Sequence, residues 1–146
     1  FYIKLSSKAY YFNEKKIFQN INNKIKFIER SSSMTNSRKK AALLIFSSIS
    51  TGHLEAVASN YPFLILNVYP NIIKENCKEI FDEMYNLRIL HYDANSLFNM
   101  LNEINDDVNG WWKTKPIQDF IKKYKNSFAR YPQNNKLKVL KEQLTF

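Results

Sequence analysis

Residues 44–66 read Leu-Ile-Phe-Ser-Ser-Ile-Ser-Thr-Gly-His-Leu-Glu-Ala-Val-Ala-Ser-Asn-Tyr-Pro-Phe-Leu-Ile-Leu. Two apolar runs, 42–46 and 63–68, enclose a loop of mostly small hydroxyl residues at 47–52 and a helix-like stretch at 53–59. Short apolar runs bounded by turn residues are typical of buried strands. The pattern predicts a β-loop-α-β unit, whose loop lies at the carboxyl end of a strand and at the amino end of a helix.

A junction of this kind is suited to bind an anion. Ligands of open α/β sheets occupy the crevice outside the carboxyl ends of the strands, and a helix amino terminus presents unpaired N–H groups and a partial positive charge. Ser50 and Thr51 offer hydroxyl groups there, and Gly52 lets a ligand approach the backbone. Glu55 follows Thr51 at a spacing of four residues, so its carboxylate can accept hydrogen bonds from a ribose diol. Each residue also has a structural interpretation, because hydroxyl residues cap helices and the helix dipole favours an early acid.

The composition is that of one folded domain. The chain has 146 residues, of which 45% are hydrophobic and 15% aromatic. This length and composition suffice to bury a core and argue against a disordered chain. A single cysteine, Cys77, excludes an internal disulfide framework and a cysteine-based zinc site. No apolar run approaches the roughly 18 residues of a membrane-spanning helix, and nothing resembles a signal peptide. Because the chain starts at Phe1 rather than Met, we expect it to be a piece of a longer protein.

The net charge of +9 is unevenly distributed. Residues 1–41 hold ten Lys and Arg against Glu14 and Glu29, a balance of +8, whereas the remaining residues hold twelve bases against eleven acids. This asymmetry favours contact with polyanions, phosphorylated ligands or an anionic membrane surface. A solvated basic face explains the same charge equally well.

Strands alternate with helices along most of the chain. The predicted strands are 1–5, 25–28, 42–46, 63–68 and 89–92, and the predicted helices are 9–20, 53–59, 72–87, 93–104, 111–130 and 136–144. Asp93 is expected to cap a helix, Pro116 to lie near a helix start, and 105–110 to form a turn. The alternation predicts an α/β fold: one Rossmann-like three-layer domain over 1–146, with a doubly wound parallel sheet of about five strands and a helical C-terminal third from 111 onward.

The two histidines are further candidates for chemistry. His53 lies at the loop–helix junction, where it either touches a bound diphosphate or is an ordinary helix-face residue. His91 ends a predicted strand and can face the same crevice. Neither has a neighbouring His, Cys or paired carboxylate, so we expect no metal site. Asp106-Asp107 is more typical of a polar turn than of a metal-binding pair, and Trp111-Trp112 is expected to pack in a core or between domains.

The stretch from Ser50 to Pro62, preceded by an apolar strand, resembles the nucleotide-binding segment in the carboxyl-terminal domain of GT-B glycosyltransferases. It is most similar to bacterial surface-polysaccharide transferases and the related glycerophosphotransferases, in which a Ser-Thr pair precedes a helix with Leu-Glu-Ala. Ile3-Lys4-Leu5 resembles the opening strand of that domain, and Trp111-Trp112 resembles a group of surface-carbohydrate transferases. There is one departure: Ser6-Ser7 stands where these proteins often have His-Pro.

The resemblance implies a glycosyltransferase that binds a nucleotide-diphosphate sugar donor. The protein would stabilise the leaving diphosphate electrostatically while a base activates the acceptor hydroxyl. That catalytic base would come from an amino-terminal domain outside this chain, and no cofactor is implied. The implied donor-binding residues are Ser50, Thr51 and Gly52 for the diphosphate, Glu55 for the ribose, Lys4 for a charge-assisted phosphate contact, and His53 at the same junction.

The expected partners are therefore the sugar donor, the missing amino-terminal domain and, peripherally, an anionic membrane. The expected location is the cytoplasm, including the inner face of its membrane. Two other classes of protein stay open: a basic nucleic-acid-binding module, and a truncated α/β domain without catalytic function. Nucleic acid is the weaker alternative, because no nucleic-acid motif is visible and the basic residues are not interleaved with aromatic ones on one face.

Overall fold

The structure is a computed structural model that describes residues 2–4, 13–29, 31–33, 36, 40–69 and 73–129. The chain divides into two compact units, Phe1–Ala42 and Leu43–Phe146. The helix expected at 136–144 lies outside the described residues.

The first unit contains strand β1 (Tyr2–Lys4), helix α1 (Glu14–Ile21) and strand β2 (Lys26–Ile28). The two strands pair in parallel, with Tyr2 opposite Lys26. Helix α1 begins later than the predicted start at residue 9, because Asn13 is its N-cap and accepts a hydrogen bond from the Lys16 N–H at 3.1 Å. An Asn side chain at the N-cap accepts a backbone N–H of the first turn that has no partner within the helix, and so fixes where the helix begins. Residues 9–12 lie outside the described part of the chain.

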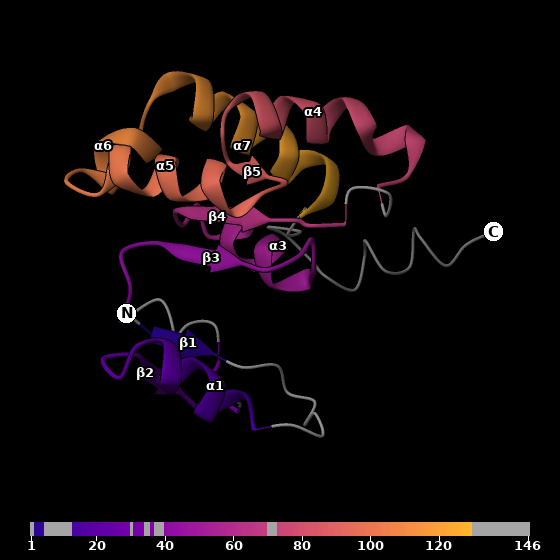
Figure 1. Ribbon diagram of the computed structural model, residues 1–146. Helices are drawn as coiled ribbons and strands as arrows, with labels where there is room; N and C mark the ends of the chain where they lie inside the picture. Colours follow the sequence, from indigo (N-terminus) through magenta and orange to yellow (C-terminus); the bar gives the residue numbers. More distant parts are fainter. Residues whose placement is uncertain are drawn as a thin grey trace. The chain divides into compact units, whose positions relative to one another are not determined.

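The second unit is built on a three-stranded parallel sheet (Figure 1). Its strands are β3 (Leu44–Phe46), β4 (Phe63–Leu66) and β5 (Leu90–His91), in that order across the sheet. Helix α3 (Thr51–Ala58) connects the first two strands, and helix α4 (Lys78–Asn86), preceded by the 3-10 turn η2 (Glu75–Cys77), connects the second two. This is the βαβ architecture predicted from residues 44–66.

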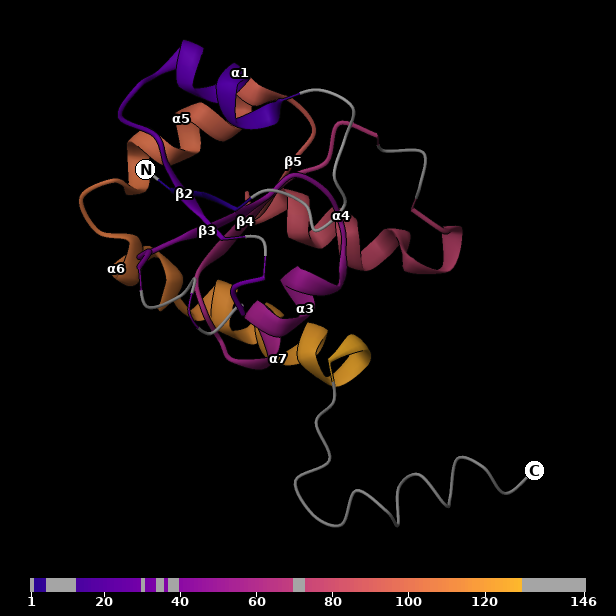
Figure 2. The ribbon, with the colours of Figure 1, turned by 90° about the horizontal axis from the view of Figure 1, so that it is seen from below.

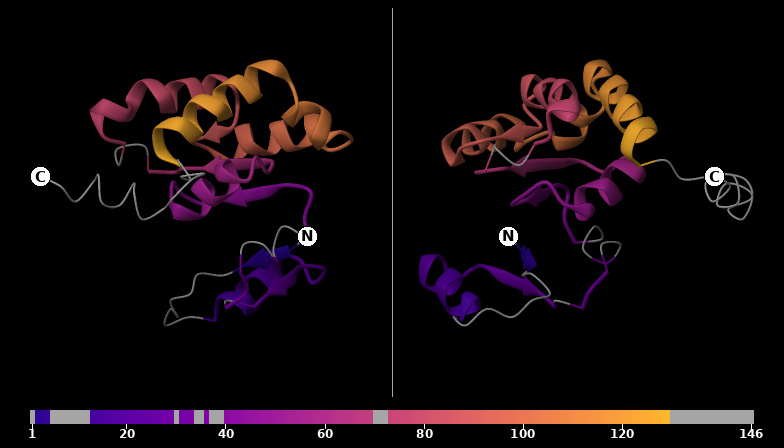
Figure 3. Two further views of the ribbon diagram at one scale, coloured as in Figure 1. Left: turned by 180° about the vertical axis from the view of Figure 1, so that it is seen from behind. Right: turned by 90° about the vertical axis from the view of Figure 1, so that its right-hand side faces the viewer.

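Helices cover both faces of this sheet. The larger core cluster joins α3, α4 and helix α7 (Lys115–Phe128) to Phe63 and Ile65 of β4, whereas a smaller one joins helix α5 (Ala94–Ile104) to Leu64. Side chains alternate between the two faces of a strand, so these clusters lie on opposite faces. Figures 2 and 3 show α5 on one side of the strands and α3 and α7 on the other. The second unit is therefore a three-layer α/β/α arrangement.

The prediction of one sheet of about five strands is not reproduced. The five described strands form two separate sheets, of two and three strands, although every pair is parallel as expected. Apolar runs identify strands, but they carry no information about which strands become neighbours. The fold is therefore mixed α/β with small parallel sheets.

The helical C-terminal region departs from the prediction in two places: the turn predicted over 105–110, and the helix predicted over 111–130, which is divided at Lys113–Thr114 between a short helix and helix α7 (Lys115–Phe128). Asp93 caps α5 as expected, and its Oδ1 accepts the Ser96 N–H at 2.8 Å. The turn predicted over 105–110 is wrong in its second half, because a short helix α6 (Val108–Trp112) begins there. Asp107 caps α6, and its Oδ1 accepts the Gly110 N–H at 2.7 Å. Asp, Asn and Gly residues, which are typical of turns, here form the start of a helix. Pro116 lies in the first turn of α7, as predicted.

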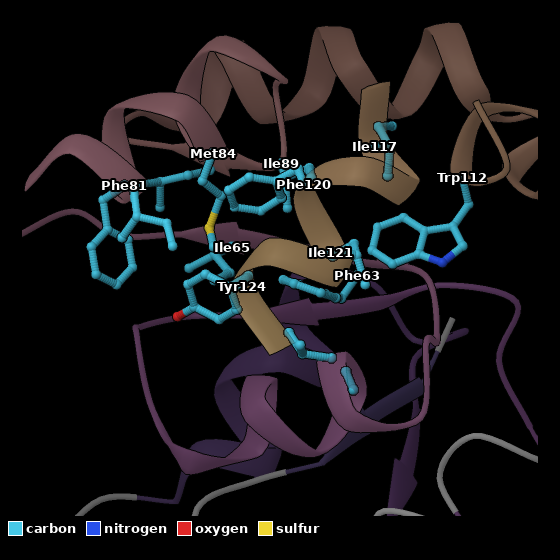
Figure 4. Packing of buried hydrophobic residues seen from close by; sticks show 14 residues of the cluster. Phe63, Ile65, Phe81, Met84, Ile89, Trp112, Ile117, Phe120, Ile121 and Tyr124 are labelled. Atoms are coloured by element: carbon cyan, nitrogen blue, oxygen red, sulfur yellow. The ribbon is translucent and has the colours of Figure 1, made fainter. Parts of the chain in front are cut away.

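The main core of the second unit is rich in aromatic side chains (Figure 4). Trp112 is 3% exposed and stacks edge-on against Phe63, with ring centroids 5.4 Å apart. This confirms the expectation that the Trp pair serves packing. Among the described residues, no helix combines the length and the apolar character needed to cross a membrane.

Candidate functional site

The junction between β3 and α3 has the geometry expected from the sequence. Strand β3 ends at Phe46, and helix α3 begins at Thr51, two residues earlier than predicted. Ser50 is the N-cap, with an extended backbone (φ −148°, ψ 171°). The loop 47–50 therefore lies at the carboxyl edge of the sheet and leads directly into the amino end of a helix.

The polar side chains of this junction reach solvent. Ser50, Thr51 and Glu55 are exposed, and Gly52 is partly exposed. Thr51 and Glu55 are four residues apart in α3 and so lie on the same side of it. The backbone at Gly52 is not in the left-handed region, so its conformation does not require glycine. A hydroxyl group and a carboxylate are thus presented together beside a helix end that attracts anions.

His53 belongs to the same turn but is buried, with 2% of its surface exposed. Its Nδ1 accepts a hydrogen bond from the Ser50 backbone N–H at 3.0 Å, and its Nε2 lies 2.8 Å from the Tyr124 hydroxyl oxygen. A backbone N–H can only donate, so Nδ1 carries no proton. In the neutral ring, Nε2 then carries the proton and donates to Tyr124. Both ring nitrogens are engaged within the protein.

Burial keeps this pair of side chains uncharged. It lowers the pKa of His53 from 6.5 to about 4, because a buried imidazolium loses its hydration. Burial also raises the pKa of the Tyr124 hydroxyl well above its ordinary value. The His53 ring is enclosed by aromatic neighbours, with the centroids of Phe46, Phe63 and Tyr124 at 6.4, 6.3 and 5.9 Å. Near neutral pH the ring is therefore a neutral hydrogen-bonding element within an aromatic cluster.

Helix α7 also holds the carboxyl end of α3. Asn60, which follows α3 with a left-handed backbone (φ 49°), donates through Nδ2 to Gln118 Oε1 at 2.8 Å and accepts the Trp112 indole N–H at 3.0 Å. Lys125 Nζ donates to the carbonyl oxygen of Ala58 at 2.9 Å. His53 pairs with Tyr124 and Asn60 with Gln118, so the two helices run antiparallel. The α3–α7 contact is therefore tied near both ends by hydrogen bonds.

His91 ends β5 at the same edge of the sheet, but its side chain is committed to the protein. Its Nε2 lies 2.9 Å from the Arg88 carbonyl oxygen, which can only accept, so Nε2 is the donor. Its Nδ1 then accepts from the Ser96 hydroxyl at 2.8 Å. Burial lowers the pKa of His91. The expected position at a strand end is correct, and the ring orders the turn between β5 and α5.

Lys4 is the one predicted site residue in the first unit. It lies in β1 and is exposed, and its Nζ donates to the backbone carbonyl of Ser32. The other predicted residues, Ser50, Thr51, Gly52, His53 and Glu55, occupy one junction of the second unit. The role of Lys4 at a phosphate stays a prediction. Within the described ranges, no three His, Cys, Asp or Glu side chains come together as a metal site.

Tyr124 is the residue of this region that the sequence did not point to. Its spacing in α7 predicts a packed helix face, and the ring is indeed buried, with 1% exposed. Helical periodicity does not reveal which polar group the hydroxyl contacts. What the sequence could have indicated is that a polar partner exists, because a buried Tyr hydroxyl needs a hydrogen bond.

The comparisons with known proteins place the chain in a family. No curated protein and no solved structure matches it. A match to the LIC12162 family transferase extends over residues 1–144, which is nearly the whole chain. The chain therefore belongs to the LIC12162 family of transferases.

Proposed function

We propose that this transferase is the donor-binding half of a GT-B type glycosyltransferase that acts in bacterial cell-surface polysaccharide synthesis. The exposed cluster of Ser50, Thr51 and Glu55 at the start of α3 carries the proposal. It lies at the carboxyl edge of a parallel sheet, where ligands of such folds bind. Membership of a transferase family supports an enzymatic role for a site at this edge.

The proposed roles follow from the chemistry of each group. The Ser50 and Thr51 hydroxyls donate to diphosphate oxygens, and the first amides of α3, which have no partner within the helix, add hydrogen bonds and a favourable dipole. Gly52 keeps this approach free of a side chain. Glu55, one turn further along α3, accepts hydrogen bonds from the ribose hydroxyls.

Two residues act less directly. Because the His53 ring nitrogens are both used inside the protein, its part in the proposal is to hold the backbone of Ser50. Lys4, with its exposed ammonium group, is proposed to neutralise phosphate charge.

The proposed reaction needs no covalent step on the protein. The junction stabilises the negative charge that develops on the leaving diphosphate, and hydrogen-bond donors fixed in advance do so without reorganisation. A base that activates the acceptor hydroxyl is proposed to come from an amino-terminal domain. The protein is proposed to act in the cytoplasm.

A peripheral contact with an anionic membrane is proposed for the first unit. Its described lysines are all exposed: Lys4, Lys15, Lys16, Lys24, Lys26 and Lys40. Lys side chains close to a membrane surface attract anionic lipid headgroups. Sedimentation with vesicles of phosphatidylcholine, with and without phosphatidylglycerol, tests this contact. Equal binding to both kinds of vesicle would argue against it.

The donor site is tested by calorimetric titration with UDP, CDP and GDP. We expect saturable binding of at least one of them, and Glu55→Ala should raise its Kd about tenfold, as expected when one hydrogen bond to a charged group is lost. Asp119→Ala is the matched control. It removes another exposed carboxylate, which is paired with Lys115 across one turn of α7, and should leave Kd unchanged. Absence of binding by all three nucleotides, or equal effects of the two variants, would refute the proposal.

A further inference from the structure

We infer that Tyr124 is a positioning residue for the Ser50–Glu55 junction and acts through the ring of His53. The path consists of two hydrogen bonds: from His53 Nε2 to the Tyr124 hydroxyl at 2.8 Å, and from the Ser50 N–H to His53 Nδ1 at 3.0 Å. It connects α7 to the loop across 71 residues of sequence. The effect on nucleotide binding rests on the function proposed above, whereas the effect on the loop does not.

The Tyr124 hydroxyl selects the tautomer that the loop needs. Ser50 requires an unprotonated Nδ1, because its N–H can only donate. That tautomer places the proton on Nε2, in a buried site where an unpaired N–H is costly. The Tyr124 oxygen removes this cost by accepting the Nε2 proton. Without the Tyr124 oxygen, the proton on Nε2 has no acceptor. In the opposite tautomer, the proton on Nδ1 points at the Ser50 N–H, so that hydrogen bond is lost.

The position of the hydroxyl oxygen is itself fixed by packing. The Tyr124 ring is 1% exposed and lies against Phe81, Phe120 and Phe128, with centroids 6.2, 5.6 and 4.9 Å away. Figure 4 shows this ring within the core cluster, with its oxygen at the margin. A closely packed ring has few alternative rotamers. The oxygen is therefore a rigid reference point for His53.

The ring of His53 transmits this constraint to the loop. Ser50 is the N-cap of α3, and its extended backbone sets the direction in which the chain enters the helix. An acceptor at the third helical position that bonds the N-cap N–H is the backbone half of a capping box. Losing that bond removes the restraint on the Ser50 N–H and loosens the chain where it enters α3, although the His53 N–H still bonds the Ser50 carbonyl at 3.3 Å. The remaining links between α3 and α7, through Asn60 to Gln118 and Lys125 to Ala58, do not involve the ring, so the helices stay together.

The loop effect is measured by NMR on the full 146-residue chain. In the wild type we expect the His53 ring nitrogens to show the tautomer protonated at Nε2, and a Ser50 amide protected from hydrogen exchange. Tyr124→Phe removes only the hydroxyl oxygen. It should abolish the single-tautomer signature and speed Ser50 amide exchange about tenfold, while amides of α4 and α5 keep their protection. Tyr85→Phe, which alters a half-exposed tyrosine of the same unit, should change neither signal.

A second variant separates positioning from general packing. In His53→Asn, the amide oxygen takes the place of Nδ1 and needs no support from Tyr124. Adding Tyr124→Phe to this variant should therefore leave Ser50 exchange unchanged, so the two substitutions are non-additive. Equal effects of Tyr124→Phe in both backgrounds would show that the hydroxyl acts only through packing and would overturn the inference.

Titration with UDP, CDP and GDP then links the loop to binding. If the wild type binds a nucleotide, Tyr124→Phe should raise its Kd three- to tenfold, and the effect should disappear in the His53→Asn background. An unchanged Kd together with an unchanged Ser50 amide would overturn the inference. If the wild type binds none of the three, the proposed function fails, and the Ser50 exchange rates alone decide whether Tyr124 positions the loop.

Discussion

Two strand-to-helix junctions at the same edge of one sheet are built in opposite ways. Between β5 and α5, the N-cap Asp93 places its own carboxylate at the helix end, where it accepts the Ser96 N–H. Between β3 and α3, the N-cap is Ser50, and no carboxylate occupies the first turn. Because a helix amino terminus attracts negative charge, the first junction supplies its own anion. The second leaves that position to solvent or to a ligand.

Both junctions nevertheless contain a buried neutral histidine. His91 donates to the backbone of Arg88 and orders the Ser96 hydroxyl, whereas His53 accepts from the Ser50 backbone and bonds to Tyr124. The imidazole thus holds the turn in each case, and the difference lies in what is left exposed. The comparison favours the exposed hydroxyl groups of Ser50 and Thr51, rather than the buried histidine, as the ligand-facing part of the site proposed at the β3–α3 junction.

The largest effect is expected from acid. The pKa of His53 is 6.5 in the unfolded chain and about 4 in the folded protein, so the unfolded state binds the proton more readily below pH 6.5. The stability contributed by the neutral ring is therefore complete above pH 6.5 and lost as pH falls towards 4, amounting to about 3 kcal/mol. Urea unfolding at pH 7 and pH 4.5 measures the loss. His53→Asn should lose clearly less stability over this range, and an equal loss would contradict the assignment.

Exchanging the caps tests the comparison next. Ser50→Asp places a carboxylate at the start of α3, as Asp93 does at α5, and should weaken nucleotide binding about a hundredfold by occupying and repelling the phosphate position. The same change should leave the melting temperature equal or higher, because Asp is a favourable cap. Asp93→Ser is the reciprocal control and should not alter Kd. Calorimetric titration and thermal unfolding give both readouts, and tight nucleotide binding by Ser50→Asp would be incompatible with the proposed site.

The smallest effect distinguishes helix stability from ligand access. Gly52→Ala should stabilise α3 by up to about 1 kcal/mol, since the glycine backbone is not left-handed and Ala is the better helix former. The added methyl group should raise the nucleotide Kd about tenfold, because it stands where the phosphate approaches. The expected result is a higher melting temperature together with weaker nucleotide binding. A higher melting temperature with an unchanged or lower Kd would show that nothing binds close to this backbone.

The local structure of the second unit could be predicted from its sequence because each signal is short-range. Asp93 marks a helix start, Pro116 marks another, and the apolar runs around 42–46 and 63–68 mark strands. The division into two sheets could not be predicted, since strand pairing depends on which edges meet. Helix α6 was missed because Gly110 suggested a turn, although it is Asp107 that begins a helix there.

Of the candidate site, the sequence predicted the exposed residues but not the buried contacts. Ser50, Thr51 and Glu55 were found because loop, helix start and spacing coincide within one stretch of chain. The burial of His53 was not predicted, because the ring is enclosed by Phe46, Phe63 and Tyr124 from three other elements. Contacts between positions as distant as His53 and Tyr124 leave no periodic trace in a single sequence.

The antiparallel contact of α3 with α7 has a consequence for synthesis. The cover for α3 is encoded at Lys115–Phe128, far downstream of the strands it helps to bury. At about 5–20 residues per second, the ribosome emits this helix several seconds after residue 60. Until then the nascent chain exposes the apolar side of α3, including Ala56 and Val57. Chaperones that shield nascent chains therefore have several seconds in which to bind this segment, and the turn at Ser50 is not held through Tyr124 until α7 has emerged.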